Sequence, residues 1–126
     1  MRLLLDTHVF LWCIKDNRRL NKSARSKILD ASVVYVSSAS IWEASIKIKI
    51  KKLDANIDQM IDAIAESGFL ELPITARHAA AVNQLADIHR DPFDRILISQ
   101  AIFEPLTLLT ADAILKKYSS LVELVN

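Results

Sequence analysis

The sequence contains almost no glycine, because Gly68 is the single one among 126 residues. Nucleotide-binding loops of the Rossmann and Walker types need several glycines, so that backbone amides can approach phosphate groups. Both kinds of loop are therefore excluded. Only three prolines are present, and no segment has the composition of a linker, a low-complexity tract or a repeat. We expect one globular domain that spans residues 1–126.

Cysteine and histidine are also scarce. Cys13 is the only cysteine, which excludes an internal disulfide, and its apolar neighbours predict a small buried side chain. The three histidines, His8, His78 and His89, lack the close pairing of a structural zinc site. We interpret each histidine as a helix-surface or partly buried side chain, and none is clearly placed to act as a general base.

Long apolar runs and a strong net charge are absent too. The longest wholly apolar runs, such as VFLWCI at 9–14, are too short to cross a bilayer, and Asp6 and His8 interrupt the N-terminal segment. We therefore expect a soluble, cytoplasmic protein that does not contact a membrane. The net charge of +1 gives no global attraction for nucleic acid, so any basic surface must be local.

Strand-like and helix-like patterns alternate along the chain. Aliphatic runs predict strands at residues 2–5, 33–36, 69–72, 106–109 and near 121–124. Helical patterns lie at residues 7–15, 22–30, from Ser40 to Lys52, from Ile57 to a cap at Gly68, at 75–88, from Asp91 onward and from Ala111. The alternation predicts an α/β fold built around a parallel sheet of about five strands.

One segment of this alternation is ambiguous. The sequence IKIKIKK at 46–52 alternates like a strand, yet it continues the helical pattern from Ile41 without a breaker. We assign it to the helix.

Acidic residues recur where strands end and helices begin. Asp6 directly follows the first strand, Asp112 follows the fourth, and Glu43 lies one turn into the helix after the second. Parallel strands place their carboxyl ends along one edge of a sheet, so these three acids should face the same crevice. Asp94 opens a helix that follows another helix, and it joins them only if the helix at 75–88 carries the chain back to that edge.

Carboxylates gathered in one crevice repel each other, which raises the pKa of some of them unless cations lie between them. Carboxylate oxygens are the ligands that Mg²⁺ and Mn²⁺ prefer in proteins. Because histidines are few and no thiol is usable, the pattern predicts a site for a hard divalent cation.

Each of these acids also has a simpler interpretation as a helix cap. The capping candidates are Asp6 or Thr7, the SIWE pattern of Ser40 to Glu43, Asp91 with Pro92 and Asp94, and Thr110 with Asp112 in the first turn. If capping is their whole role, the protein is a non-enzymatic binding module of the same fold. A haloacid-dehalogenase-like phosphatase also fits the LLLD opening, but it needs a second aspartate where the chain has His8.

Four segments resemble those of one known family, namely LLLDTH at 3–8, SSASIWEASIK at 37–47, DPFDRILISQA at 91–101 and LLTADA at 108–113. In this order, across essentially the whole chain, they resemble the PIN-domain family and, more narrowly, the VapC-type toxins of bacterial type II toxin–antitoxin systems. The resemblance implies a three-layer α/β/α sandwich with a five-stranded parallel sheet. It also implies a Mg²⁺- or Mn²⁺-dependent ribonuclease that forms homodimers and is held inactive by a cognate VapB-type antitoxin.

The motifs also imply which residues form the site. By motif position, the metal-site acids are Asp6, Glu43, Asp94 and Asp112. Thr110 maps to a hydroxyl position beside the site, and Asp91 is typical of the DPFD subgroup. One departure concerns the helix end near the antitoxin groove, because relatives often have a glycine before KL and this chain has Lys51 before Lys52 and Leu53.

Hydrolysis of a phosphodiester at neutral pH needs an activated water and a stabilised leaving oxygen, and one or two divalent ions about 4 Å apart can supply both. We assign Asp6 and Asp94 as principal ligands, and Glu43 and Asp112 complete the set directly or through water. The candidates for contact with RNA phosphates are Arg18, Arg19, Lys47, Lys49, Lys51, Lys52 and Arg95. For the lysines, a solvated helix face is the simpler interpretation.

The helix that begins at DPFD is apolar around much of its circumference, which predicts deep burial and suits a dimer contact. Its apolar residues are Phe93, Ile96, Leu97, Ile98, Ala101 and Ile102. We interpret Trp12 and Trp42 as core residues rather than as platforms for base stacking. Trp42 neighbours Glu43 and so points away from the site, which suits packing or a partner surface.

Overall fold

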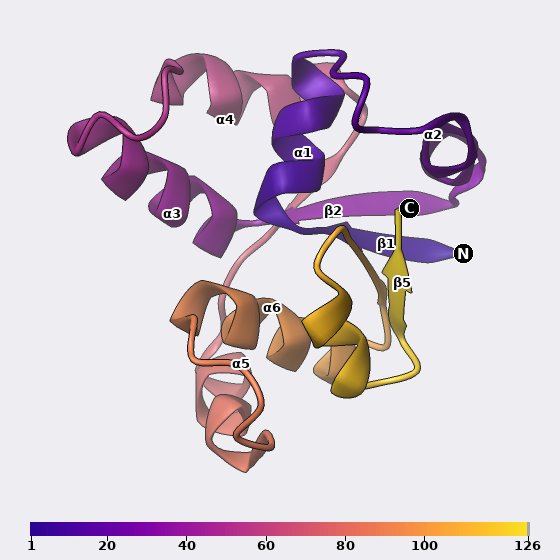
Figure 1. Ribbon diagram of the computed structural model, residues 1–126, viewed down its shortest axis with the longest axis vertical. Helices are drawn as coiled ribbons and strands as arrows, with labels where there is room; N and C mark the ends of the chain where they lie inside the picture. Colours follow the sequence, from indigo (N-terminus) through magenta and orange to yellow (C-terminus); the bar gives the residue numbers. More distant parts are fainter. Residues whose placement is uncertain (126) are drawn as a thin grey trace.

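The computed structural model describes residues 1–125 and contains a five-stranded sheet with helices on both faces (Figure 1). The strands are β1 (Arg2–Leu5), β2 (Val33–Ser37), β3 (Leu70–Leu72), β4 (Thr107–Thr110) and β5 (Val122–Leu124). They lie in the order β3-β2-β1-β4-β5, and each neighbouring pair is parallel. The predicted α/β fold with a five-stranded parallel sheet is therefore confirmed.

Helices connect these strands. They are α1 (Thr7–Ile14), α2 (Lys22–Asp30), α3 (Ser38–Lys49), α4 (Ile57–Glu66), α5 (Ala76–Ala81) and α6 (Pro92–Phe103), with short 3-10 helices η1 (Val82–Gln84) and η2 (Ala113–Lys117). Within residues 1–125, none of them combines the length and the apolar character that a membrane span requires.

Strand β1 lies at the centre of the sheet and is buried on both faces. Successive side chains of a strand point to opposite faces, so Leu3 and Leu5 join one apolar core and Leu4 joins the other. The first core includes side chains of α1, α2 and α4, and the second includes those of α6 and η2. Helix α3 contributes to both, through Ala44 and Ala39. This arrangement is the expected three-layer sandwich.

Helix α3 begins earlier than its predicted start at Ser40. Ser37 is the N-cap, and its Oγ accepts a hydrogen bond from the Ala39 amide at 3.0 Å. Ser40 therefore lies inside the helix, so the interpretation of Ser40 to Glu43 as a capping box is wrong. The Thr7 hydroxyl donates to Ser40 Oγ at 2.9 Å instead, which ties α3 to α1. Several serines precede α3, and a local pattern alone does not distinguish which of them is the cap.

The alternating segment at 46–52 is helical as far as Lys49, which confirms most of its assignment. The helix ends with Ile50 as C-cap, and Lys51 has a φ of 62°. A residue with a β-carbon is strained in this left-handed region, whereas glycine is not. The chain thus carries a lysine at the helix end where glycine would fit without strain.

The predicted helix at 75–88 is too long. Helix α5 ends at Ala81, η1 ends at Gln84, and the chain is extended at Leu85, so no helix reaches Ile88. The sequence contains no proline or glycine that would mark this early end.

A tertiary contact explains the early end of α5. The guanidinium of Arg95, in α6, donates to the backbone carbonyls of Val82 and Ala86, each at 3.1 Å, and of His89 at 3.3 Å. The Val82 carbonyl also accepts from the Leu85 amide at 3.1 Å, and the guanidinium adds a side-chain donor to all three carbonyls. As a result the chain leaves the helix and returns to the carboxyl edge of the sheet just before α6.

His78, in α5, is completely buried, so its interpretation as a helix-surface or partly buried residue is wrong. Its Nδ1 accepts a hydrogen bond from the Thr75 amide at 3.0 Å, and its Nε2 lies 2.6 Å from Glu104 Oε2. The ring therefore provides a hydrogen-bond acceptor for the amide that begins α5, and it connects α5 to Glu104 at the end of α6. Its role is structural.

The helix predicted from Ala111 is the 3-10 helix η2, which begins at Ala113. Asp112 is its N-cap and accepts from the Ile114 amide at 3.0 Å, so Asp112 does not lie in a first turn capped by Thr110. Thr110 is the last residue of β4 and is completely buried.

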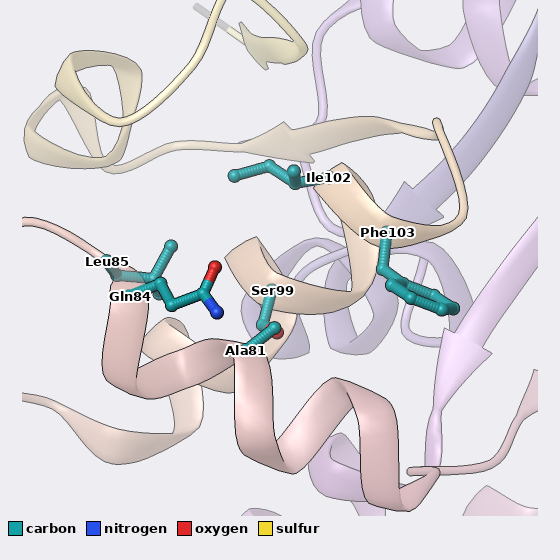
Figure 2. A pocket seen from close by; sticks show the side chains of 6 residues that line it. All are labelled: Ala81, Gln84, Leu85, Ser99, Ile102 and Phe103. Atoms are coloured by element: carbon teal, nitrogen blue, oxygen red, sulfur yellow. The ribbon is translucent and has the colours of Figure 1, made fainter.

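Burial along α6 follows the prediction only in part. Leu97, Ile98 and Ala101 are buried, whereas Ile102 is 44% exposed. A pocket of about 290 Å³ lies between this end of α6 and the end of α5 with η1 (Figure 2). Its lining residues are Ala81, Gln84, Leu85, Ser99, Ile102 and Phe103.

The aromatic residues outside the core also need one correction. Trp42 is 61% exposed, so its interpretation as a core residue is wrong. It packs edge-on against Phe93, with ring centroids 5.0 Å apart. Trp12 packs against the first core, with the Arg19 guanidinium 6.0 Å above its ring. Cys13 is half-buried, and this burial raises the pKa of its thiol to about 11, so the thiol is unreactive.

Candidate functional site

Asp6 lies where β1 ends and α1 begins, and it is fixed from two sides. As N-cap of α1, its Oδ1 accepts from the Val9 amide at 2.8 Å. Its Oδ2 accepts from the hydroxyl of Thr110, at the end of neighbouring β4. The residue is 4% exposed, and this burial raises the pKa of Asp6, against the opposing effect of the two hydrogen bonds.

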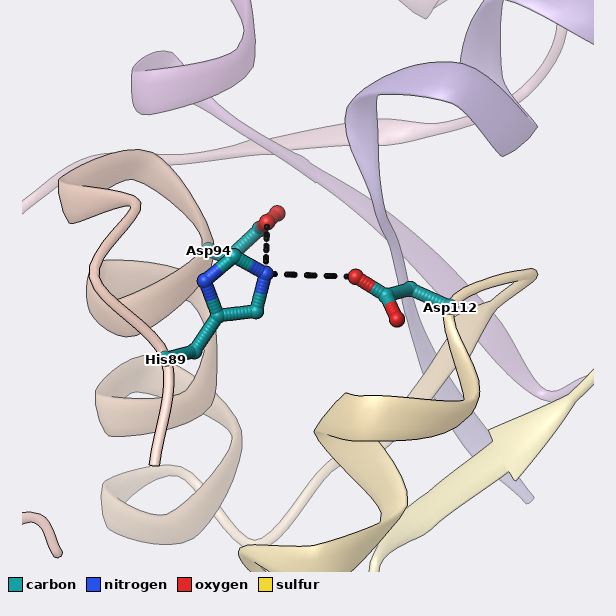
Figure 3. A group of neighbouring side chains, drawn as sticks. All are labelled: His89, Asp94 and Asp112. Carbon is teal, nitrogen blue, oxygen red and sulfur yellow. Dashed lines mark hydrogen bonds and ion pairs between the residues drawn. The ribbon is translucent and has the colours of Figure 1, made fainter. Parts of the chain in front are cut away.

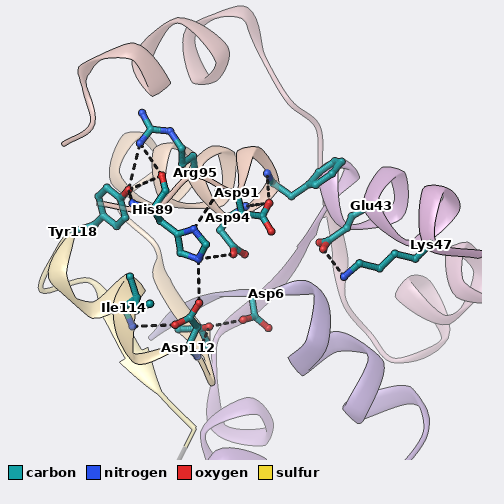
Figure 4. A network of polar contacts seen from close by, with 12 residues as sticks. Asp6, Glu43, Lys47, His89, Asp91, Asp94, Arg95, Asp112, Ile114 and Tyr118 are labelled. Atoms are coloured by element: carbon teal, nitrogen blue, oxygen red, sulfur yellow. Dashed lines mark hydrogen bonds and ion pairs between the residues drawn. The ribbon is translucent and has the colours of Figure 1, made fainter. Parts of the chain in front are cut away.

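Glu43 reaches the same edge from α3. It is 5% exposed, and its Oε2 forms an ion pair at 2.9 Å with Nζ of Lys47, one helical turn further on (Figure 4). The Lys47 ammonium group therefore supplies positive charge to a carboxylate that would otherwise be buried among acids.

Asp94 lies in the first turn of α6. Burial raises the pKa of Asp94 to about 7, and repulsion from Asp91, Asp6 and Glu43 adds to this effect. His89 acts in the opposite direction. His89 Nε2 lies 3.4 Å from Asp94 and 3.2 Å from Asp112, which follows β4 closely, so the chain does return α6 to the carboxyl edge of the sheet.

Asp112 closes the crevice from η2, together with a residue that the sequence interpretation missed. His89 Nε2 lies 3.2 Å from Asp112 Oδ2 and 3.4 Å from Asp94 Oδ2 (Figure 3). One ligand atom from each of these three residues lies within 4.8 Å of the others. The available indication in the sequence was that His89 lies two residues before the DPFD segment, which begins at Asp91.

The backbone of His89 is held by Arg95 and Tyr118 (Figure 4). Its amide donates to the Tyr118 hydroxyl at 2.6 Å, and Arg95 NH1 donates to its carbonyl at 3.3 Å. Arg95 NH1 also lies 3.3 Å from the Tyr118 hydroxyl. The guanidinium of Arg95 is thus directed at the loop before α6, and its contact with a phosphate stays a prediction.

Asp91 is the N-cap of α6. Its Oδ1 accepts from the amides of Phe93 at 2.9 Å and Asp94 at 3.4 Å, and Pro92 occupies the first turn. The structure therefore gives Asp91 the capping role, and it places the carboxylate close enough to Asp94 to raise the pKa of Asp94.

The donor set fits a hard divalent cation. The raised pKa values of Asp6 and Asp94 mean that their negative charges are poorly compensated by the protein, and a cation between them would relieve this cost. Asp6, Asp94, Glu43 and Asp112 offer oxygen ligands, as Mg²⁺ and Mn²⁺ prefer.

Comparisons with known proteins agree with this fold. A family model for the PIN domain matches residues 3–121. VapBC2 from Rickettsia felis, bound to promoter DNA, aligns with a TM-score of 0.74 and 17% identity over 98% of both chains. DNA-bound VapBC from Salmonella typhimurium aligns with a TM-score of 0.71 and 17% identity over 100% of this chain and 99% of the other.

A toxin–antitoxin complex from Klebsiella pneumoniae is also similar, with a TM-score of 0.67 and 18% identity over 98% of both chains. Identities this low show a shared fold. A search of curated proteins found no significant match. Because the family model spans nearly the whole chain, the protein belongs to the PIN domain family, whose members are generally nucleases.

Proposed function

We propose that the protein is a divalent-metal-dependent endoribonuclease that hydrolyses RNA phosphodiester bonds as the VapC-type toxin of a toxin–antitoxin pair. The observation that carries the proposal is the convergence of four acids at one sheet edge, with raised pKa values for two of them. The acids are Asp6, Glu43, Asp94 and Asp112. Membership of the PIN domain family supports a nuclease, and the likeness to toxin–antitoxin complexes supports a toxin.

In this proposal Asp6 and Asp94 are the principal ligands, and Glu43 and Asp112 complete the set directly or through water. When bound, Mg²⁺ or Mn²⁺ supplies an activated water and stabilises the leaving oxygen. Thr110 and the Val9 amide fix both oxygens of Asp6, so this carboxylate loses little freedom on binding. The pKa of Asp94, about 7, means that this carboxyl releases its proton near neutral pH to act as a ligand.

A groove of about 460 Å³ beside the acids is the best placed path for RNA. Lys47, Lys52 and Arg90 line it, together with Glu43 and Asp91. Positive side chains next to a carboxylate site suit a phosphate backbone whose scissile group reaches the acids. Lys49, Lys51, Arg18, Arg19 and Arg95 remain further candidates for phosphate contact.

Two protein partners belong to the same proposal. A VapB-type antitoxin is expected because the similar solved structures are toxin–antitoxin complexes. A homodimer is expected because Ile102 and Phe103 leave apolar surface exposed at the end of α6. A toxin that acts on cellular RNA would be located in the cytoplasm.

Metal-dependent cleavage of RNA tests the proposal directly. The purified protein should cleave RNA with Mg²⁺ or Mn²⁺ and lose this activity in excess chelator. Millimolar Mg²⁺ should also raise the melting temperature, because a ligand that binds only the native state stabilises it. Undiminished cleavage in chelator would contradict metal dependence.

The non-enzymatic alternative is tested by calorimetry. A binding module whose acids are only helix caps should release no heat of binding with Mn²⁺, whereas a metal centre should bind Mn²⁺ in a carboxylate-dependent manner. The phosphatase alternative needs a second aspartate two residues after Asp6. The chain has the exposed His8 at that position, so the second carboxylate is missing.

A further inference from the structure

We propose that His89 is a positioning residue, whose Nε2–H bridges Asp94 and Asp112 and holds both carboxylates for the cation without coordinating it. The inference rests on the proposed function, because it concerns acids that are proposed to bind a divalent ion. Distances alone do not distinguish this role from coordination, because the ligand atoms of His89, Asp94 and Asp112 lie within 4.8 Å of one another, as in a metal-ligand set.

The hydrogen bond at Nδ1 decides the tautomer. The backbone amide of Asp91 donates to His89 Nδ1 at 3.1 Å. A backbone N–H can only donate, so Nδ1 must offer its lone pair and carry no proton. The neutral ring therefore carries its single proton on Nε2.

The proton on Nε2 excludes coordination from that nitrogen. A ring nitrogen binds a metal ion through a lone pair, and a protonated Nε2 has none to offer. The N–H instead faces Oδ2 of Asp112 at 3.2 Å and Oδ2 of Asp94 at 3.4 Å (Figure 3). The Nε2–H group is thus shared between two carboxylates. The other oxygen of Asp94, Oδ1, takes no part in this bridge.

The bridge joins the ends of two elements, α6 and η2, that share one apolar core. Asp94 lies at the start of α6 and Asp112 caps η2, and these segments follow different connections from the sheet. A donor between the two acids reduces their repulsion and sets their separation. Hydrogen bonds of this kind to ligating carboxylates tune the affinity of metal sites.

The protein holds the ring of His89 by clamping its backbone. The Tyr118 hydroxyl accepts from the His89 amide at 2.6 Å, and Arg95 donates to the His89 carbonyl at 3.3 Å. Residues 85–91 have no regular secondary structure, so no helix or strand holds the backbone of His89 in place. The hydrogen bonds from Arg95 and to Tyr118 do so instead. Arg95 and Tyr118 therefore act on the site through His89.

Calorimetric titration with Mn²⁺ tests the role of the bridge. His89→Ala should weaken Mn²⁺ binding about 10- to 100-fold, as the loss of an outer partner of metal ligands typically does. His89→Gln should recover most of this affinity, because its amide N–H₂ can donate from near the position of Nε2. The control Gln59→Ala removes an exposed polar side chain of α4 and should leave the affinity unchanged.

Equal Mn²⁺ affinity of His89→Ala and the wild type overturns the inference, and so does a His89→Gln variant as weak as His89→Ala. In both cases a wild type that binds Mn²⁺ and cleaves RNA leaves the proposed function intact. A wild type that binds no Mn²⁺ overturns the proposed function and the inference together.

Nuclear magnetic resonance of the imidazole gives a readout that does not depend on affinity. The ring ¹⁵N and ¹³Cδ2 shifts distinguish the two tautomers, and Mg²⁺ is diamagnetic. We expect the Nε2–H tautomer in the metal-free and in the Mg²⁺-loaded protein. A change to the Nδ1–H tautomer when Mg²⁺ binds would make His89 a ligand and overturn the inference.

Discussion

The two sides of the crevice are built by different means. On the sheet side, Asp6 is 4% exposed and accepts hydrogen bonds from Val9, in its own helix, and from Thr110, on the neighbouring strand. On the opposite side, the Asp94 side chain is 22% exposed, and its partner His89 belongs to an irregular segment. The partners of Asp6 therefore belong to regular elements, α1 and β4, whereas the partner of Asp94 belongs to an irregular segment.

The electrostatic consequence also differs between the two sides. Burial is the main cause of the raised pKa of both Asp6 and Asp94. Hydrogen bonds from Thr110 and Val9 oppose this effect at Asp6, while repulsion from three other carboxylates increases it at Asp94. A bound cation would therefore relieve burial at both acids, and at Asp94 it would also relieve the repulsion from three neighbouring carboxylates.

Asp94→Asn should produce the largest effect. It removes the charge of a principal ligand and preserves the shape, so RNA cleavage should fall about 1000-fold, equivalent to several kcal/mol of transition-state stabilisation. The fold should survive, and the metal-free variant should be at least as stable as the wild type because repulsion is relieved. One cleavage assay with Mn²⁺ and one melting curve are sufficient, and full activity would contradict the assignment.

Thr110→Val tests the sheet side. The completely buried hydroxyl donates to Asp6 and accepts from the Asp112 amide at 3.1 Å, so its loss leaves the buried Asp6 carboxylate and the partly buried Asp112 amide without this partner. We expect a cost of about 1–3 kcal/mol in the free energy of unfolding. Thr107→Val, at the other end of β4, is the matched control and should change little. Equal stability of the two variants would contradict the conclusion that the Thr110 hydroxyl holds Asp6 on the sheet side.

Asp91→Ala should have a smaller effect on the other side. The loss of the α6 cap should cost about 0.5–2 kcal/mol in unfolding free energy and leave appreciable cleavage activity. Asp91→Asn is the control, because asparagine caps nearly as well. If Asp91→Ala abolished cleavage at unchanged stability, while Asp94→Asn stayed active, the roles of cap and ligand would be reversed.

The pH dependence of stability without metal tests the electrostatics of the Asp94 side directly. The pKa of Asp94, about 7 in the folded protein, lies above its ordinary value of 3.8, so the folded state binds protons more tightly than the unfolded state. The free energy of unfolding should therefore fall as pH rises from about 4 to about 7, and this contribution should be constant above that range. Denaturant titrations in chelator should show that the free energy of unfolding falls less over this pH range in Asp94→Asn than in the wild type. An equal fall in both proteins would contradict the raised pKa of Asp94.

Much of the sheet side could be predicted from the sequence, because its geometry follows from local patterns. The run LLL reads as a strand buried on both faces, and an aspartate directly after it must lie at the carboxyl edge of a parallel sheet. Helix α2 and the start of α6 have caps and periodicity that agree, and both were placed where the structure has them.

The other side could not be predicted in full, because it depends on contacts distant in sequence. Nothing near Ala81 marks the end of α5, which depends on a guanidinium from α6. The role of His89 depends on Asp112 and on the hydroxyl of Tyr118, both more than twenty residues away. Residue patterns indicated which acids gather, but they did not indicate the segment that holds Asp94 in place.

The order of the strands has a consequence for when activity can arise during synthesis. Strand β1 is made before the other four strands, yet one of its two neighbours is β4, at residues 107–110, which follows β2 and β3 along the chain. The Thr110 hydroxyl on Asp6 and the carboxylate of Asp112 therefore join the site only after residues 110–112 have been synthesised. Long-range pairing of this kind forms late and slowly. Until the chain has been synthesised beyond Asp112, the candidate site is therefore incomplete, and activity that depends on its acids cannot arise.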